Sequence, residues 1–212
     1  DSREDRRGIY FVLDKYLCFE DYRTQMENLF AIVLVSIAAL ASPKVQAATG
    51  APACPALLQH SFPRLQDEKP QALCQYAGRV LLVVNTASYC GFTPQYKGLE
   101  ALHAKSQAAG LVVLGFPSND FSQETGSNKD IADFCENTFG VKFPMFAKSA
   151  VRGRDANPLF RQLAERTGRA PLWNFHKYLV GRDGTVIGNW TSMTAPDDPA
   201  LVKLIEQQLA RR

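Results

Sequence analysis

The stretch NTASYCGFTPQY, residues 85–96, places a single cysteine between an apolar run and a segment with helical spacing. The run before it, RVLLVVNT, is apolar and rich in β-branched residues, which is typical of a strand buried on both faces. Cys90 is therefore predicted in the turn from a strand to a helix N-terminus, where backbone N–H groups and the helix dipole stabilise a thiolate. The alternative is a small buried side chain, because free cysteine is among the most buried residue types.

Patterns for other kinds of chemistry do not occur in the chain. Its histidines, His60, His103 and His176, are scattered, and there is no CxxC, HxxxH or HExxH spacing, so we expect no metal site. There is no P-loop, G-x-S-x-G or G-x-G-x-x-G sequence, so we expect no bound cofactor. The net charge is +3 with acidic and basic residues interspersed, and without a basic stripe we expect no nucleic-acid partner.

Two of the five cysteines, Cys54 and Cys74, flank a loop-rich segment within the lead-in of residues 49–78. We predict a structural disulfide between them, which an oxidising compartment would permit. A bond that closes a loop of about 20 residues contributes about 3 kcal/mol in the chain-entropy model. The alternative is a pair of free or buried thiols.

The N-terminal part of the chain has the pattern of an export signal. Residues 29–41 form an apolar run of the length of a signal h-region, and residues 45–47 supply the small residues that a signal peptidase prefers. We therefore expect a signal peptide over residues 26–48, an exported, periplasmic protein, and a non-native upstream extension over residues 1–25. The segment after Met26 lacks a positive charge, and an uncleaved anchor or a buried helix is the alternative.

Residues 79–212 are predicted to form one domain of alternating elements, in the order strand, helix, strand, helix, helix, strand, strand, helix. This order is typical of an α/β protein with a thioredoxin-like fold, in which helices cover both faces of a mixed central sheet. The expected elements are strand 80–86, helix 94–109, strand 111–116, helix 127–138, helix 158–167, hairpin 177–190 and helix 198–210.

Local signals set the ends of these elements. Thr93 is a candidate N-cap, Ser127 with Asp130 resembles a capping box, and Asp183-Gly184 is a hairpin turn signal. Helical spacing predicts two buried faces, formed by Tyr96, Leu99, Leu102 and Ala109 in one helix and by Ile131, Phe134, Cys135 and Thr138 in another.

The surroundings of Cys90 resemble a known family. The segments NTASYCGFTPQYKGLEAL, GFPSNDFSQETGSNKDIADFC, FPMF and WNFHKYLV follow one another in the order found in the glutathione peroxidase family. The resemblance spans residues 78–209. It implies a thioredoxin-like fold and a thiol-dependent peroxidase that reduces hydrogen peroxide and organic hydroperoxides in defence against oxidative stress.

The same resemblance implies roles for particular residues. The family's reactive selenocysteine or cysteine falls on Cys90, and its catalytic Gln, Trp and Asn fall on Gln123, Trp173 and Asn174. Hydrogen-bond donors from these side chains could stabilise the thiolate and help to protonate the departing oxygen. The loop before Gln123 is one residue shorter than the family pattern and Thr125 replaces a proline, so a displaced Gln123 is an open alternative.

In cysteine-containing relatives a second cysteine closes a disulfide with the oxidised one, and this role falls on Cys135. The helix around Cys135 would have to unwind locally, because a disulfide needs Cα atoms within about 7 Å. The alternative for Cys135 is a core side chain. The resemblance favours a thioredoxin-like reductant over glutathione, and a short segment before WNF favours a monomer.

Two other functions remain open from the sequence. A thiol–disulfide oxidoreductase would share the fold, but Thr93 stands where a CxxC enzyme has its second cysteine. A non-catalytic redox sensor would keep Cys90 without turnover. Rapid consumption of peroxide with a thiol donor would separate the peroxidase from both.

Overall fold

The computed structural model describes residues 53–211. The expected signal peptide (26–48) and upstream extension (1–25) lie outside the described residues. Within 53–211, no helix combines the length and the apolar character that a membrane span needs.

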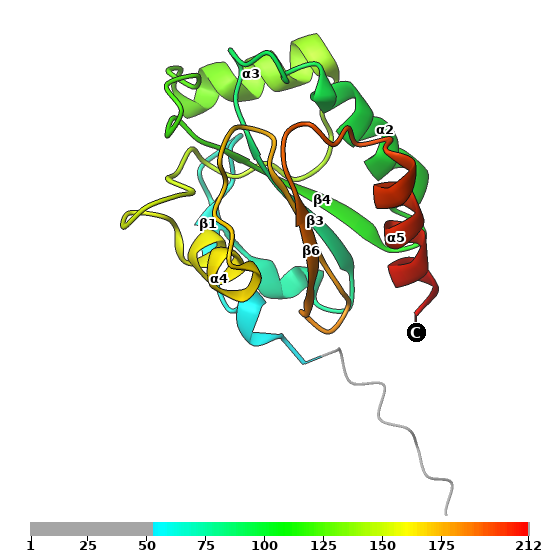
Figure 1. The fold of residues 1–212 in the computed structure, drawn as a ribbon. Coiled ribbons are helices and arrows are strands. Elements are labelled where there is room, and N and C mark those ends of the chain that lie inside the picture. Colours follow the sequence, from blue (N-terminus) through cyan, green and yellow to red (C-terminus); the bar gives the residue numbers. More distant parts are fainter. Residues whose placement is uncertain (1–52, 212) are drawn as a thin grey trace, which may run out of the picture. The chain divides into compact units, whose positions relative to one another are not determined.

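The centre of the domain is a four-stranded mixed sheet in the order β4-β3-β5-β6 (Figure 1). Its strands are β3 (Val80–Thr86), β4 (Leu111–Pro117), β5 (Lys177–Val180) and β6 (Val186–Trp190). β3 pairs with β4 in parallel and with β5 antiparallel, and β5 and β6 form the expected hairpin. All seven residues of β3 are buried, which explains its continuous apolar sequence. The prediction of an α/β fold with a mixed sheet is confirmed.

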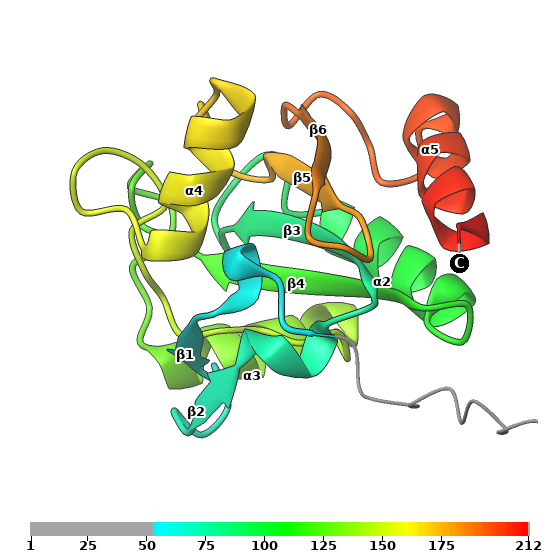
Figure 2. The same ribbon diagram turned by 90° about the horizontal axis from the view of Figure 1, so that it is seen from below.

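Helices cover both faces of this sheet (Figures 1 and 2). They are α2 (Gln95–Ser106), α3 (Asn128–Phe139), α4 (Pro158–Thr167) and α5 (Pro199–Ala210). The side chains of β3 alternate between two cores: Val80, Leu82 and Val84 pack with apolar residues of α2, α3 and α5. Leu81 and Val83 pack with α4 and the lead-in. The alternation follows from the period of two in a strand.

α2 is shorter at both ends than the expected helix 94–109. The Thr93 hydroxyl does not cap it: this oxygen accepts a hydrogen bond from the Cys90 N–H and donates one to the Ala87 carbonyl, each at 3.0 Å. Thr93 therefore closes the turn that carries Cys90. At the other end, the chain leaves the helix after Ser106, and Ala109 is exposed rather than buried.

α3 begins as the sequence predicts. The Ser127 side chain accepts from the Asp130 N–H, and the Asp130 side chain accepts from the Ser127 N–H, so both halves of the capping box are present. The inward face is narrower than expected. Ile131 and Cys135 are buried, whereas Thr138 is exposed.

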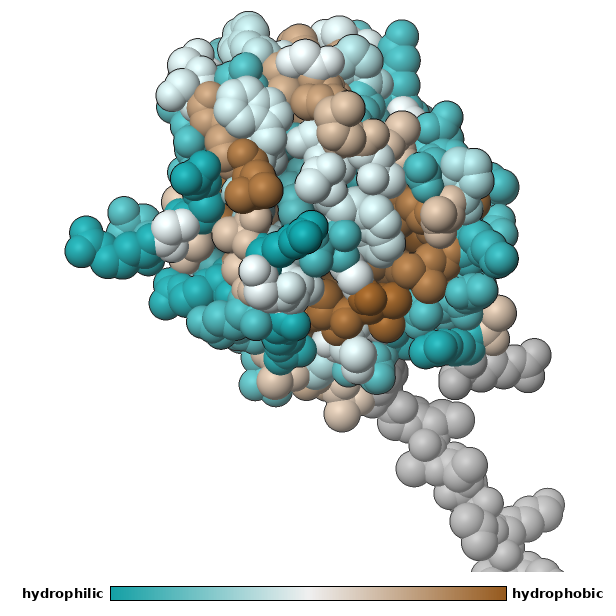
Figure 3. Space-filling view, viewed as in Figure 1, coloured by the Kyte–Doolittle hydropathy of each residue, from teal (hydrophilic) through white to brown (hydrophobic). Residues whose placement is uncertain are grey.

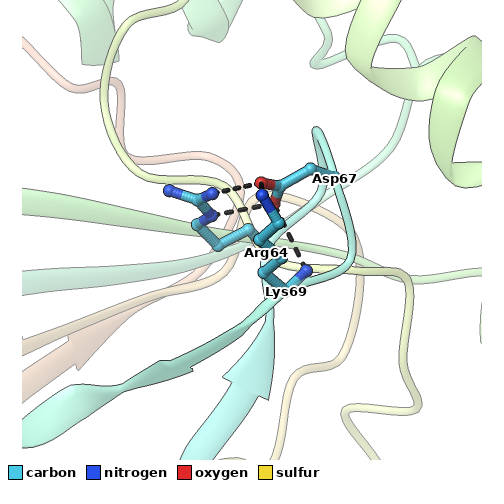
Figure 4. A network of polar contacts seen from close by, with 3 residues as sticks. All are labelled: Arg64, Asp67 and Lys69. Atoms are coloured by element: carbon cyan, nitrogen blue, oxygen red, sulfur yellow. Dashed lines mark hydrogen bonds and ion pairs between the residues drawn. The ribbon is translucent and has the colours of Figure 1, made fainter.

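The lead-in, which the sequence predicts to be rich in loops, contains a hairpin. Its strands, β1 (Ser61–Pro63) and β2 (Pro70–Ala72), are antiparallel, short and contain proline, so they carry little strand signal. Asp67 in the turn pairs with Arg64 and lies near Lys69 (Figure 4). The hydrogen bond from Arg64 lowers the pKa of the Asp67 carboxyl.

Cys54 and Cys74, the pair that the sequence predicted, are joined by a disulfide with a Cα–Cα distance of 5.2 Å. The bond links the segment just before the short helix η1 (Ala56–Leu58) to the short helix η2 (Leu73–Tyr76). The buried residues of the two helices, Leu57, Leu58, Leu73 and Tyr76, pack in the core on the α4 side of the sheet.

Replacing both Cys54 and Cys74 by serine is expected to lower the free energy of unfolding by about 3 kcal/mol, because the unfolded chain regains the freedom of the open loop. Urea unfolding under non-reducing conditions measures the change. As a control, wild-type protein unfolded with a reductant present should match the double variant. Equal unfolding midpoints for the variant and the oxidised wild type would contradict the prediction.

Candidate active site

Cys90 lies in the tight turn between β3 and α2 and is 7% exposed. Its Sγ atom accepts a hydrogen bond from the Phe92 N–H at 3.4 Å. The Cys90 N–H is held by the Thr93 hydroxyl, so the turn is closed around the sulfur. This geometry presents a backbone donor to the charged form of the cysteine, in agreement with its predicted place at a helix N-terminus.

Gln123 and Asn174 meet beside this turn although they are 51 residues apart. The Asn174 amide nitrogen donates to the Gln123 side-chain oxygen at 2.8 Å. The Tyr89 N–H donates to the Gln123 carbonyl at 3.1 Å, which ties Gln123 to the Cys90 turn. Gln123 therefore reaches the site despite the shorter loop before it.

The amide of Asn174 does not donate to the sulfur in this structure, in contrast to the sequence expectation. It is fully buried and its nitrogen is directed at Gln123 instead. Because Asn174 fixes the Gln123 oxygen, the Gln123 amide nitrogen is the end of this pair that remains able to donate to a peroxide.

Trp173 is 41% exposed, so it is not an ordinary core aromatic. Its ring packs on Phe121 with centroids 5.3 Å apart, and the guanidinium of Arg152 lies over Phe121 at 5.2 Å from the ring centre. A positive charge therefore lies next to the aromatic wall of the site.

Apolar side chains are unusually exposed around the site. Tyr89, Leu172 and Met193 are each more than two-thirds exposed. The Tyr89 ring stacks on Phe134 of α3, with centroids 6.4 Å apart. Figure 3 shows that hydrophobic residues reach the surface in several separate patches among hydrophilic ones. We call Tyr89, Phe134, Leu172, Trp173 and Met193 the apolar rim, in which Phe134 is half-buried and the others are exposed. Exposed apolar groups favour contact with an apolar ligand or partner.

Cys135 lies on the buried face of α3 and carries a free thiol, as does Cys90. Burial raises the pKa of the Cys135 thiol to about 11, and the nearby Tyr96 hydroxyl opposes the rise. At neutral pH Cys135 is therefore a protonated, enclosed thiol. It could attack an oxidised Cys90 only after local release of α3.

Three buried polar residues near the site escaped the sequence analysis. Glu124 is fully buried, its carboxylate accepts from the Ser88 hydroxyl at 3.1 Å, and burial raises its pKa. Asn85 and Lys177 are also fully buried, at strand ends. The sequence offered one signal for Asn85: it is a polar residue within a predicted buried strand, and a buried polar group needs hydrogen-bond partners.

A metal centre has no support in the described part of the chain. In residues 53–211, no three His, Cys, Asp or Glu side chains gather closely enough to hold a metal ion.

Comparisons with known proteins identify the family of this chain. The family model for glutathione peroxidase matches residues 59–164, which include Cys90, Gln123 and Cys135. Thioredoxin/glutathione peroxidase BtuE from Escherichia coli is 41% identical over 170 residues, covering 68% of this chain and 93% of that protein. Hydroperoxy fatty acid reductase gpx1 from Synechocystis is 48% identical over 145 residues, covering 63% of this chain and 86% of that protein.

A solved structure shares the fold at much lower identity. A thiol:disulfide interchange protein of the thioredoxin family from Chlorobium tepidum superposes with a TM-score of 0.55 at 14% identity, covering 71% of this chain and 92% of that chain. The fold is therefore thioredoxin-like. The family match, the two relatives and the site around Cys90 together show that the chain belongs to the glutathione peroxidase family.

Proposed function

We propose that this protein reduces hydrogen peroxide and organic hydroperoxides through Cys90, with Cys135 as the resolving thiol and a thioredoxin-like protein as the reductant. The protein is a thiol-dependent peroxidase of the glutathione peroxidase type. The observation that carries the residue assignment is the hydrogen bond between Gln123 and Asn174, which places two amides from distant segments beside the Cys90 turn.

The first step is attack of the Cys90 thiolate on one peroxide oxygen. The S–O bond forms as the O–O bond breaks, and the attacked oxygen stays on the sulfur with its hydrogen. The departing oxygen takes back, through solvent, the proton that the Cys90 thiol released on ionising, and it leaves as water or an alcohol. Cys90 is oxidised to a sulfenic acid. The Phe92 N–H stabilises the thiolate. The Gln123 amide and the Trp173 indole N–H are the side-chain hydrogen-bond donors that stabilise the charge on the departing oxygen.

The second step is condensation of Cys135 with the sulfenic acid. The Cys135 sulfur displaces the hydroxyl of Cys90, a disulfide forms, and water carries away the oxygen and the thiol proton. A dithiol reductant then opens the disulfide by exchange and is itself oxidised. Because a glutathione-binding cluster of basic side chains was not evident in the sequence, we favour the dithiol over glutathione.

In the decisive experiment, the protein with Cys90 and Cys135 in the reduced state is treated with one equivalent of hydrogen peroxide. The state of each cysteine is then mapped by mass spectrometry. The proposal expects a new Cys90–Cys135 bond beside an unchanged Cys54–Cys74 bond. If Cys90 became a sulfenic or sulfinic acid while Cys135 stayed reduced, the resolving thiol would be an external one such as glutathione and not Cys135. An unmodified Cys90 would refute the peroxidase assignment.

A thiol–disulfide oxidoreductase fits less well. Thr93 occupies the position of the second cysteine of a CxxC motif, and its hydroxyl is engaged in closing the Cys90 turn. The relatives named as a peroxidase and as a hydroperoxy fatty acid reductase are far more similar in sequence than the thiol:disulfide interchange protein, whose likeness concerns the fold alone.

Export to the periplasm and a monomeric state are part of the proposal. The apolar run at 29–41 supports export, and a structural disulfide suits an oxidising compartment. Protein sequencing of the mature N-terminus tests it: a start near residue 48 supports cleavage, and a start at Asp1 contradicts it. The short segment before Trp173 supports the monomer, which light scattering would measure.

The apolar rim and Arg152 together suit a hydroperoxide with an apolar chain and an anionic end, such as a fatty acid hydroperoxide, the substrate type in the Synechocystis relative's name. Replacing Arg152 by glutamine is therefore expected to lower kcat/KM for a fatty acid hydroperoxide about three- to fivefold, the range of an exposed ion pair. Steady-state assays should show unchanged kcat/KM for hydrogen peroxide.

Arg154→Gln is the matched control, because this arginine lies on the same loop, is 96% exposed and pairs with Asp155. It should leave both substrates unaffected. The methyl ester of the fatty acid hydroperoxide should be insensitive to Arg152→Gln. The proposed role of Arg152 would be contradicted if Arg152→Gln lowered kcat/KM equally for the acid and the ester, or if both arginine variants lowered it equally.

A further inference from the structure

The turn that carries Trp173 and Asn174 has a strained backbone. Phe175 adopts φ = 63°, a left-handed conformation that is unfavourable for a bulky side chain. Ser122, which precedes Gln123, adopts φ = 57°. Each amide of the Gln123–Asn174 pair therefore lies next to a residue in the left-handed region. Such conformations persist only where neighbouring contacts hold them.

Asn85 holds this turn from the end of β3. Its amide nitrogen donates to the Trp173 carbonyl at 3.2 Å, and its amide oxygen accepts from the His176 N–H at 3.0 Å. Its own carbonyl accepts from the Phe175 N–H at 2.6 Å. One fully buried residue thus bonds to the backbone on both sides of Asn174.

Lys177 holds the same turn from β5. Its ammonium group donates to the Phe175 carbonyl at 2.8 Å and to the Gln95 side-chain oxygen at 2.7 Å. Gln95, the first residue of α2, donates in turn to the Ser192 carbonyl at 2.7 Å, and the Ser192 hydroxyl donates to the Asn174 carbonyl at 2.5 Å. The turn is thereby connected to the helix that begins just after Cys90.

Burial of the Lys177 ammonium group costs folding free energy. The side chain is fully buried, none of the ion pairs found in the described residues includes it, and burial lowers its pKa to about 7. A buried cation contributes less to stability than a well-packed apolar side chain of similar size. Its hydrogen bonds to Phe175 and Gln95 therefore point to a role at the site rather than in overall stability.

We propose that Asn85 and Lys177 are positioning residues of the peroxidase site, which hold the turn of residues 173–175 in its strained form and so keep Asn174 bonded to Gln123. The inference rests on the proposed function. Without these bonds, Phe175 relaxes to negative φ and the Asn174 amide rotates away from Gln123. The Gln123 amide nitrogen then loses its fixed direction toward the peroxide.

The test compares two reactions of Cys90 in the variant Lys177→Met, which removes the ammonium and keeps the chain length. One is the stopped-flow rate of Cys90 oxidation by hydrogen peroxide, and the other is its alkylation rate with iodoacetamide. Both reactions need the thiolate, so their ratio cancels any change in the thiolate fraction. Only the peroxide reaction needs the positioned amides, and the ratio is expected to fall about tenfold or more.

Two further variants keep the result interpretable. Gln95→Met removes one acceptor of Lys177 from a half-buried position and should also lower the ratio of oxidation rate to alkylation rate. If Lys177→Met does not fold, this variant provides the test of the proposal. Leu163→Ala in α4 destabilises the core on the opposite face of the sheet and should leave the ratio unchanged. An unchanged ratio in the folded Lys177 and Gln95 variants, or an equal fall in Leu163→Ala, would overturn the inference.

This failure is distinct from failure of the proposed function. If the protein were not a peroxidase, wild-type Cys90 would be alkylated by iodoacetamide but would not be oxidised rapidly by hydrogen peroxide. If only the inference were wrong, the wild type would react rapidly and the Lys177→Met variant would match it.

Discussion

Replacement of Cys90 by serine is expected to reduce peroxide consumption to background, a loss of about a thousandfold or more. The serine hydroxyl is not ionised at neutral pH and cannot accept the peroxide oxygen as a sulfenic acid. The measurement is peroxide-dependent oxidation of a thioredoxin and thioredoxin reductase system. The change from sulfur to oxygen keeps the turn closed by Thr93, so the fold should be unaffected.

The control for Cys90→Ser is the thermal unfolding midpoint, which should stay close to that of the wild type. A folded variant that still consumed peroxide would show that the reaction does not proceed through Cys90. If the unfolding midpoint of the variant were much lower, loss of structure could explain the lost activity. Cys90→Ala would then be the second variant, because it removes the nucleophile without adding a polar atom.

Replacement of Cys135 by serine is expected to stop turnover with thioredoxin while Cys90 is still oxidised at the wild-type rate. Without the resolving thiol, the sulfenic acid at Cys90 persists and proceeds to a sulfinic acid with excess peroxide. Single-turnover oxidation and intact-protein mass spectrometry measure the two effects separately. Serine is similar in volume to cysteine, which limits the change in packing at this 2%-exposed position.

The outcome for Cys135→Ser decides between its two roles. Unchanged thioredoxin-supported turnover would mean that Cys135 is a core side chain, which was the alternative reading of its helical position. Turnover with glutathione but not with thioredoxin would show that an external thiol can replace it.

In the proposed second step, Cys135 has to leave its buried position before it reacts. Its pKa of about 11 keeps the thiol protonated in place, and release from the core would return it toward the ordinary value for cysteine. α3 is suited to local opening, because Ile131 and Cys135 are its buried residues and the rest of the helix is half-buried or exposed. The capping box at Ser127 secures the first turn, and Gly140 in a left-handed conformation ends the helix.

The sequence by itself determined the order of the elements from β3 to α5 and the place of Cys90 in the turn after β3. The apolar run of β3, the capping box of α3 and the Asp183-Gly184 turn are local signals, because each depends on residues within a few positions. The predicted start of α2 was wrong because Thr93 bonds backward to the Cys90 turn instead of forward to the helix. The hairpin of β1 and β2 was missed because short strands with proline give almost no pattern.

For the site, the sequence supplied the candidates Cys90, Gln123, Trp173 and Asn174 through a family resemblance, but it could not show how they meet. Only the tertiary structure revealed that Asn174 donates to Gln123, and that Trp173 is partly exposed beside Arg152. It alone revealed the buried bonds of Asn85 and Lys177 to the same turn. The physical reason is distance along the chain, because these contacts join segments tens of residues apart. Local periodicity and propensity do not encode which buried polar groups form hydrogen bonds with one another.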